Sequence, residues 1–214
     1  RLTCRSYQDG VQVGDSQTSL FTLTVPQALS PKVTVELTDP EGALGLYIEK
    51  ISRLQVVVST TLFYSALEAS TAITLDGEAY TGAVLEAGEH TLSVTVTDTR
   101  GLTGTWERTL QVVAYTPPQV ELHASRCRAD GTLDDTGDHA AVTVRGAVTP
   151  LPGNTAVLTL TYGKTVQELP AEVGEFESSA LIPADPNETL HIKARVVDAV
   201  KGTTRPMNLP TGDP

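Results

Sequence analysis

The clearest structural pattern in the sequence is Thr91-Leu-Ser-Val-Thr-Val-Thr-Asp98, in which apolar and polar residues alternate. Successive side chains of a β-strand point to opposite faces, so the leucine and the two valines share one face of this stretch. A turn-rich link, Thr99-Arg-Gly-Leu-Thr-Gly104, then leads into a second strand-like run over residues 105–113. The stretch therefore predicts a β-hairpin that closes a domain.

The same unit returns near the C-terminus as Thr189-Leu-His-Ile-Lys-Ala-Arg-Val-Val-Asp198, followed by the turn residues Lys201-Gly-Thr-Thr204. Its alternate apolar residues, from Leu190 to Val196, form the expected inward face. Leu92 and Leu190 lie 98 residues apart in the sequence. This spacing is typical of immunoglobulin-like modules.

A third copy of the hairpin opens the chain. Arg1-Leu-Thr-Cys-Arg-Ser-Tyr7 leads through Asp9-Gly10 and Gly14-Asp15 into Phe21-Thr-Leu-Thr-Val25. We interpret residues 1–29 as the C-terminal strands of a preceding module or as a leading hairpin. Because the sequence starts within a strand-like run, we expect the chain to be a piece of a longer protein.

Prolines mark the ends of the repeated hairpins. Pro26 and Pro31 follow the first hairpin, and Pro117 and Pro118 follow the second. Proline cannot donate to a central strand ladder and therefore suits the joint between two sandwiches. The sequence predicts an all-β fold of tandem immunoglobulin-like or fibronectin-III-like β-sandwiches, with complete modules over residues 30–116 and 117–214.

Strands within the two modules follow from the same period-2 pattern. The run Val56-Val-Val58 predicts a strand that is covered on both faces. Besides the closing hairpins, the first module is expected to hold strands over residues 32–37, 52–60, 70–75 and 83–85. In the second module they are expected over 119–124, 140–148, 155–162 and 175–181.

Charge and cysteine content exclude several classes of partner. The 214 residues include 26 acidic and 15 basic side chains, a formal net charge of -11, which disfavours nucleic acid and anionic membrane surfaces. No stretch approaches the roughly 18 apolar residues of a membrane span.

Cys4 and Cys127 fall in different predicted modules, so we expect both to be small core or edge residues and expect no disulfide across a sandwich.

The sequence contains none of the motifs that mark common active sites, which predicts a protein that is not an enzyme. Trp106 shares a strand face with Arg108, Leu110 and Val112. This pattern leaves two interpretations open: a sugar-stacking platform on an exposed sheet, or a residue that fills the core or edge of a strand.

One loop has more chemical character than the rest of the chain. Residues 128–139 bring together Asp130, Asp134, Asp135 and Asp138 around a Gly-containing turn. Calcium prefers roughly six to eight oxygen ligands, which such carboxylates supply, but the loop lacks the glutamate that ends an EF-hand loop. A calcium site that stiffens a domain border and a solvated turn therefore both stay open.

Three stretches together resemble the minor structural, tail-associated proteins of long-tailed phages and prophages of Gram-positive bacteria. They are Gly45-Leu-Tyr-Ile-Glu-Lys-Ile-Ser-Arg-Leu-Gln-Val56, the hairpin over residues 94–104 with Val112-Val-Ala-Tyr-Thr-Pro-Pro118, and the loop over residues 124–137. The resemblance runs in order from about residue 20 to residue 200.

The resemblance implies a virion component near the tail tip, in which stacked modules act as spacers or contact the host wall. The implied partners are other tail proteins, further copies of the same chain and host cell-wall glycan. No catalytic residue is implied. Two other classes use similar modules and stay open: a bacterial surface adhesin and a carbohydrate-binding module.

Overall fold

The computed structural model describes residues 2–20 and 24–212 of the chain. The fold is all-β, as the alternating patterns predict: strands β1 to β18 are joined by turns and loops, and the one helical element described is a 3-10 turn over Gln27–Leu29. Across the described residues, no helix is long and apolar enough to cross a membrane.

By the proximity of their Cα atoms, the residues form two compact units. One contains Arg1–Glu36, Val57–Ala79 and Leu92–Arg108, and the other contains Leu37–Val56, Tyr80–Thr91 and Thr109–Pro214. The module boundaries near residues 30 and 117 stay predictions.

The N-terminal strands pair differently from the prediction. β1 (Leu2–Cys4) pairs with β4 (Gln17–Ser19), and β2 (Tyr7–Gln8) pairs with β3 (Val11–Gln12). Asp9 and Gly10 both have positive φ, at 51° and 81°, and so form a two-residue hairpin turn that brings the chain back early. Of the expected return strand, 21–25, residues 21–23 lie outside the described residues, and 24 and 25 are not in a strand.

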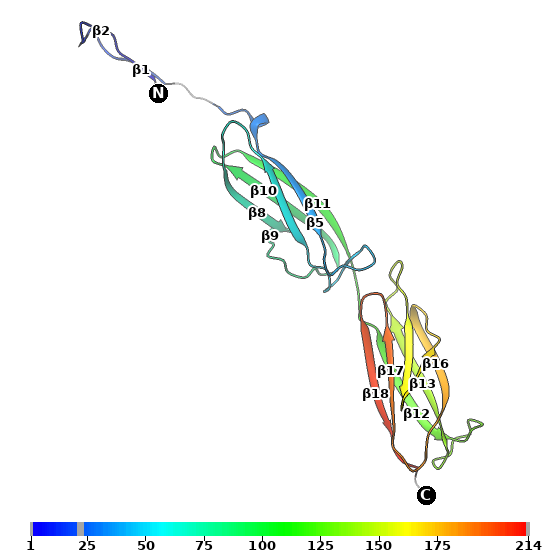
Figure 1. Ribbon diagram of the computed structural model, residues 1–214. Coiled ribbons are helices and arrows are strands. Elements are labelled where there is room, and N and C mark those ends of the chain that lie inside the picture. The colour runs from blue at the N-terminus through cyan, green and yellow to red at the C-terminus, as the bar shows by residue number, and fades with distance from the viewer. Residues whose placement is uncertain (1, 21–23, 213–214) are drawn as a thin grey trace. The chain divides into compact units, whose positions relative to one another are not determined.

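A five-stranded sheet contains the hairpin predicted over residues 91–113 (Figure 1). Its strand order is β6 (Tyr47–Ile48), β11 (Thr103–Val113), β10 (Gly88–Asp98), β8 (Glu68–Leu75) and β9 (Glu78–Ala79). A separate pair is formed by β5 (Lys32–Thr38) and β7 (Gln55–Thr61). Leu92, Val94 and Val96 are each fully buried, which confirms the inward face predicted for this hairpin.

Two expectations for this region are wrong. Residues 83–85 form no strand, because the backbone of buried Leu85 bonds instead to loop residues: its N–H donates to the Ser52 carbonyl, and its carbonyl accepts from Lys50. Val57 is 54% exposed, so β7 is not covered on both faces. A strand whose side chains alternate between core and solvent has one open face, as antiparallel sheets commonly do.

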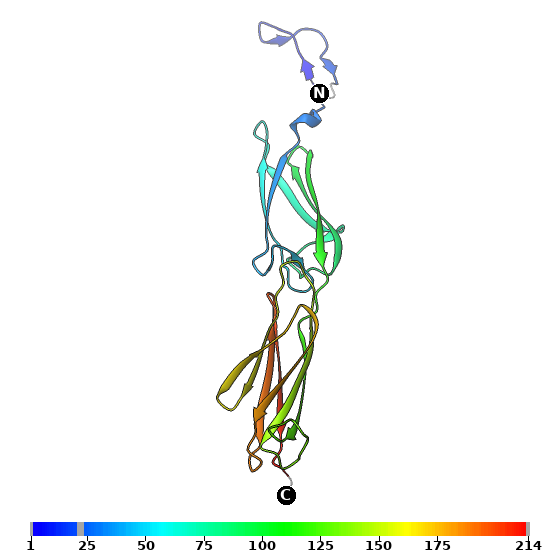
Figure 2. The same cartoon turned by 90° about the vertical axis from the view of Figure 1, so that its right-hand side faces the viewer.

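The strands from β12 onward form a β-sandwich of two antiparallel sheets, coloured green to red in Figures 1 and 2. One sheet has the order β12 (Gln119–Cys127), β13 (His139–Val148) and β16 (Gly174–Pro183). The other has the order β15 (Thr165–Leu169), β14 (Val157–Tyr162), β17 (Leu190–Val197) and β18 (Gly202–Leu209). β18 ends at Leu209, and residues 210–212 after it are not in a strand.

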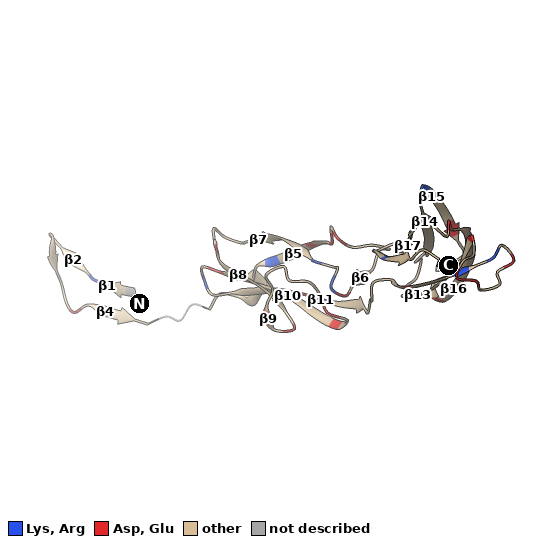
Figure 3. Ribbon diagram, turned by 90° about the horizontal axis from the view of Figure 1, so that it is seen from below, with Lys and Arg blue, Asp and Glu red and all other residues tan. Residues whose placement is uncertain are grey.

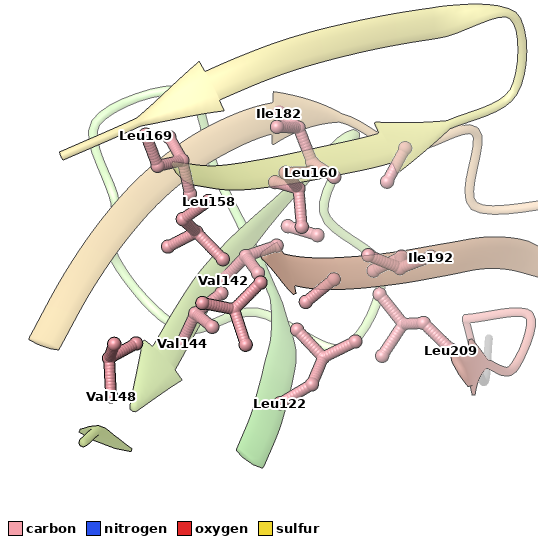
Figure 4. Close-up of a cluster of buried hydrophobic side chains, with 14 residues drawn as sticks. Leu122, Val142, Val144, Val148, Leu158, Leu160, Leu169, Ile182, Ile192 and Leu209 are labelled. Carbon is pink, nitrogen blue, oxygen red and sulfur yellow. The ribbon is translucent and has the colours of Figure 1, made fainter. Parts of the chain in front are cut away.

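Aliphatic side chains from both sheets meet in the core of this sandwich (Figure 4). Val142 and Val144 come from β13, and Leu158 and Leu160 come from the facing strand β14. All four are 0–1% exposed. Full burial of such a side chain contributes about 1.5–3 kcal/mol, so this core stabilises the packing of the two sheets.

Candidate functional site

The short segment between β11 and β12 contains a buried tyrosine. Tyr115 is only 7% exposed, although it lies beside the proline pair that follows Thr116. Its hydroxyl donates to the carboxylate of Asp198 and lies 3.2 Å from each carboxylate oxygen. The segment that leads into the C-terminal sandwich is therefore attached to it by a charge-assisted hydrogen bond.

Asp198 occupies the turn between β17 and β18 and is 6% exposed. Its Oδ1 atom accepts from the backbone N–H groups of Val200 and Lys201, at 2.7 and 2.6 Å. Its Oδ2 atom faces Tyr115 and accepts from Asn154 Nδ2 at 3.3 Å. A buried carboxylate needs such donors to offset the loss of water. Burial and then the nearby Asp198 charge raise the pKa of Tyr115, so its hydroxyl stays a donor at neutral pH.

The side chain of Thr149 fixes the backbone of the same segment. Thr149 Oγ1 donates to the carbonyl of Thr116 at 2.7 Å and accepts from the Thr116 N–H at 3.2 Å. On the preceding residue, the Tyr115 N–H donates to Glu49 Oε2 at 3.3 Å. Side-chain and backbone groups together hold residues 115 and 116, so this cluster can fix the path of the chain. We refer to Tyr115, Thr116, Thr149, Asn154 and Asp198 as the linker cluster.

Within the acidic loop, Asp134 already has several donors. Its Oδ2 atom accepts from Arg128 Nε at 2.7 Å, and its Oδ1 atom accepts from the Thr136 N–H and hydroxyl. The hydrogen bond from Arg128 and those from Thr136 lower the pKa of Asp134. Arg128 is the one arginine or lysine that this loop sets against its four aspartates, and Figure 3 shows basic (blue) and acidic (red) residues on the loop that extends beyond β16. The ion pair with Arg128 therefore neutralises the charge of Asp134.

The other three aspartates of the loop are spread out. Asp130 caps the N–H of Thr132, Asp138 pairs with His139 at 2.7 Å, and Asp135 is exposed. Within the described ranges, no three His, Cys, Asp or Glu side chains are placed to hold a metal ion. Calcium binding by the four aspartates stays a prediction, and calorimetric titration with calcium that gives no heat above dilution would remove it.

A hollow of about 480 Å³ lies on the outer face of β12, β13 and β16. Its main charged row consists of Glu121, Arg145 and Glu177, which the strand register places side by side. Arg145 Nη2 donates to Glu177 Oε1 at 3.1 Å, and this bond together with both negative charges raises the pKa of Arg145. Gln119 and Glu175 extend the polar lining. The sequence could not predict this group, because its members come close only through the strand register.

Trp106, Cys4 and Cys127 all lie in β-strands. Trp106 is half-buried on β11, in the row that also holds buried Gly104 and Leu110. A sugar-stacking role for it stays a prediction. Cys127 is buried and Cys4 is exposed, and both are free thiols.

Comparison with known proteins gives no family for this chain. No protein-family model matches it, and no curated protein matches it. Among solved structures it is similar to SGBP-B of the mixed-linkage glucan utilization locus of Bacteroides ovatus, in complex with a mixed-linkage heptasaccharide. The identity is 10%, the alignment covers 83% of this chain and 70% of that chain, and the TM-score is 0.26. A likeness at this TM-score carries no argument about function.

Proposed function

We propose that the chain is a non-enzymatic structural part of a phage tail, where its modules space or present a part that recognises the host. The proposal follows the resemblance of three stretches of the sequence to tail-associated proteins. It gains support from the all-β fold, because tandem β-sandwiches reach a distance without needing a pocket.

The observation that carries the proposal is the linker cluster. A spacer transmits position only if its joints resist bending, and flexible linkers lack such resistance. Tyr115, just before the predicted boundary at residue 117, is buried and bonded through its hydroxyl to Asp198 and through its N–H to Glu49. A short segment with fixed side-chain and backbone partners suits a spacer.

Location in the particle tests the proposed function. An antibody raised against this chain should label the tails of purified phage particles from the producing strain, as seen by electron microscopy. Mass spectrometry of the same particles should recover peptides of the chain. Label on the wall of bacteria that carry no phage would contradict the proposal and favour a surface adhesin.

Carbohydrate binding is the second candidate, and the hollow on the β12–β13–β16 sheet favours it. Its lining offers carboxylate, guanidinium and amide groups, which can hydrogen-bond to sugar hydroxyls. Glu121, Glu175 and Glu177 outnumber Arg145, so a neutral host-wall glycan fits the hollow better than an anionic one.

A glycan array probed with the whole chain tests this second candidate. If the hollow binds sugar, one class of neutral glycan should retain the chain, and Arg145→Ala should abolish retention. Arg128→Ala removes a different exposed arginine and should leave it unchanged. Silence across the array, or equal loss in both variants, would exclude binding at this hollow.

A further inference from the structure

The turn between β10 and β11 contains a second buried aspartate. Asp98 is 1% exposed, and its Oδ1 atom accepts from the N–H groups of Arg100 and Leu102, at 2.8 and 3.0 Å. Its Oδ2 atom accepts from Arg100 Nε and Nη2, at 2.9 and 2.6 Å. The carboxylate is thus fully engaged by one turn and one guanidinium.

The guanidinium of Arg100 continues to the segment that precedes β5. Its Nη2 atom also donates to the carbonyl of Leu29, at 3.0 Å. Leu29 is the last residue of the 3-10 turn, between Pro26 and Pro31. Asp98 therefore holds, through Arg100, a proline-marked segment that lies 71 residues from Arg100 in the sequence.

Asp98 and Asp198 occupy the same place in their hairpins and both accept from turn amides. Each lies where the turn of its hairpin begins. The Asp98 N–H donates to the Leu102 carbonyl, and the Asp198 N–H donates to the Lys201 carbonyl. In each, Oδ1 accepts two turn amides. In Asp98, Oδ2 accepts from Arg100, which also bonds to the incoming segment, and in Asp198 the Tyr115 hydroxyl of the incoming segment lies 3.2 Å from both carboxylate oxygens. The donors differ in type and origin: the guanidinium of Arg100 belongs to the hairpin turn, and the phenol of Tyr115 belongs to the incoming segment.

We infer that the turn of each of the two long hairpins, β10–β11 and β17–β18, is a docking site for the proline-marked segment that packs against it, built on a buried aspartate. Its ligand is a hydrogen-bond donor of the chain itself, supplied by Tyr115 or relayed by Arg100. The inference deepens the proposed spacer function and rests on it only for its purpose. Because the carboxylate oxygens are shielded and occupied, these sites hold the chain and do not bind small molecules.

Two side chains are less exposed than their positions in the chain would lead one to expect. A tyrosine in a short proline-rich segment would ordinarily be exposed, yet Tyr115 is buried. An arginine in a hairpin turn would ordinarily face solvent, yet Arg100 has 21% side-chain exposure and turns back onto the Asp98 carboxylate. Both side chains lose rotamer freedom, which hydrogen bonds to a buried charge can offset.

Amide hydrogen exchange on the whole chain tests the inference, with Tyr115→Phe and Arg100→Lys as conservative variants. Tyr115→Phe keeps the ring and removes the donor, so protection of the Thr116 amide should fall at least about tenfold. Arg100→Lys keeps the charge but cannot bond both Asp98 and Leu29 in the same geometry. Protection of the Leu29 and Ser30 amides should fall by a similar factor.

Tyr64→Phe and Arg145→Lys are the matched controls, since Tyr64 is 81% exposed and Arg145 pairs with Glu177 on the sheet surface. Both should leave the amides of residues 29, 30 and 116 unchanged. Unchanged exchange of these amides in the test variants would overturn the inference, and so would uniform acceleration throughout the strands, which marks general destabilisation. These rates do not depend on where the chain is located, so failure of the docking sites and failure of the phage-tail proposal are separate results.

Discussion

Phe176 lies directly opposite Gly146 where β16 pairs with β13, and its ring occupies the space of the missing side chain. A Cβ atom at position 146 would lie 2.4 Å from Phe176 Cζ and 2.3 Å from the carbonyl oxygen of Gln119 on the other neighbouring strand. An aromatic ring that covers a strand glycine protects the backbone there and fills the end of the core. Gly146 is therefore required by its neighbours, and its φ is not positive.

Gly146→Ala should destabilise the C-terminal sandwich by about 1–3 kcal/mol, because the added methyl group overpacks a fixed site. The free energy of unfolding in urea measures this. Gly202→Ala is a matched control on β18, since its nearest neighbour, a Val197 methyl carbon at 3.1 Å, belongs to a side chain that can move. Phe176→Ala should not restore Gly146→Ala, because the Gln119 carbonyl stays in place. Full restoration would contradict this account.

Arg126 is a buried cation, and among the described residues its hydrogen-bond partners are all backbone carbonyls. It is 6% exposed and lies on β12, near the end of the C-terminal sandwich. The carbonyls that accept from its guanidinium belong to Gly137, Ala184, Asp185, Glu188 and Pro210. One side chain therefore ties the acidic loop, the loop after β16 and the segment after β18 to each other.

Arg126→Met should cost about 3 kcal/mol or more, because it leaves several buried carbonyls without a donor. Thermal unfolding monitored by circular dichroism should show a clear drop in Tm. Arg128→Met is the control: Arg128 has 68% side-chain exposure and one ion pair, which contributes little. Equal Tm values for the two variants would show that the carbonyls find water once the arginine is removed.

The buried hydroxyl of Ser52 offers a third test. Ser52 Oγ accepts from the Ile48 N–H at 2.7 Å, and both residues are fully buried. Ser52→Ala should destabilise the chain by about 1–3 kcal/mol, because it leaves the Ile48 amide without its acceptor. The same amide should exchange faster with solvent than in the wild type. Ser59→Ala changes a serine of β7 and should leave the Ile48 amide unaffected.

The sequence predicts strands well where the alternation is long. The hairpin around Leu92 and the strand from Leu190 are found as expected, because burial on one face of a sheet imposes period 2 on the side chains. The prediction is wrong for residues 83–85, since Leu85 is buried by loop contacts that leave no periodic signal. The short strands β6 and β9, of two residues each, are below the length that alternation can reveal.

The linker cluster was only partly predictable. The repeated hairpins and the proline pair indicated a joint near residue 117. The contact between Tyr115 and Asp198 spans 83 residues and depends on the sandwich that brings the last hairpin back to the first strand. The repeated Val-x-Asp at residues 96–98 was the available signal, because Asp198 likewise ends a valine-rich strand. Its meaning depends on burial, which the sequence does not state.

Asp98 predicts a pH dependence of stability. Its burial would raise its pKa, but the hydrogen bonds and positive charge from Arg100, together with those from the turn amides, outweigh burial and hold the pKa below the ordinary 3.8. A carboxyl whose pKa is lowered on folding stabilises the folded state above its ordinary pKa, and this contribution is lost as the pH falls through the lower value.

The free energy of unfolding should therefore fall more steeply below about pH 4 in the wild type than in Asp98→Asn, which has no carboxyl to protonate at this position. Urea unfolding between pH 6 and pH 2 measures both curves. Asp130, Asp134 and Asp138 also have lowered pKa values, but they are present in both proteins and leave the difference unchanged. The difference between the curves should shrink with acidification, because the wild type then loses what the variant never had. A constant difference across this range would mean that Asp98 stabilises the turn without depending on its charge.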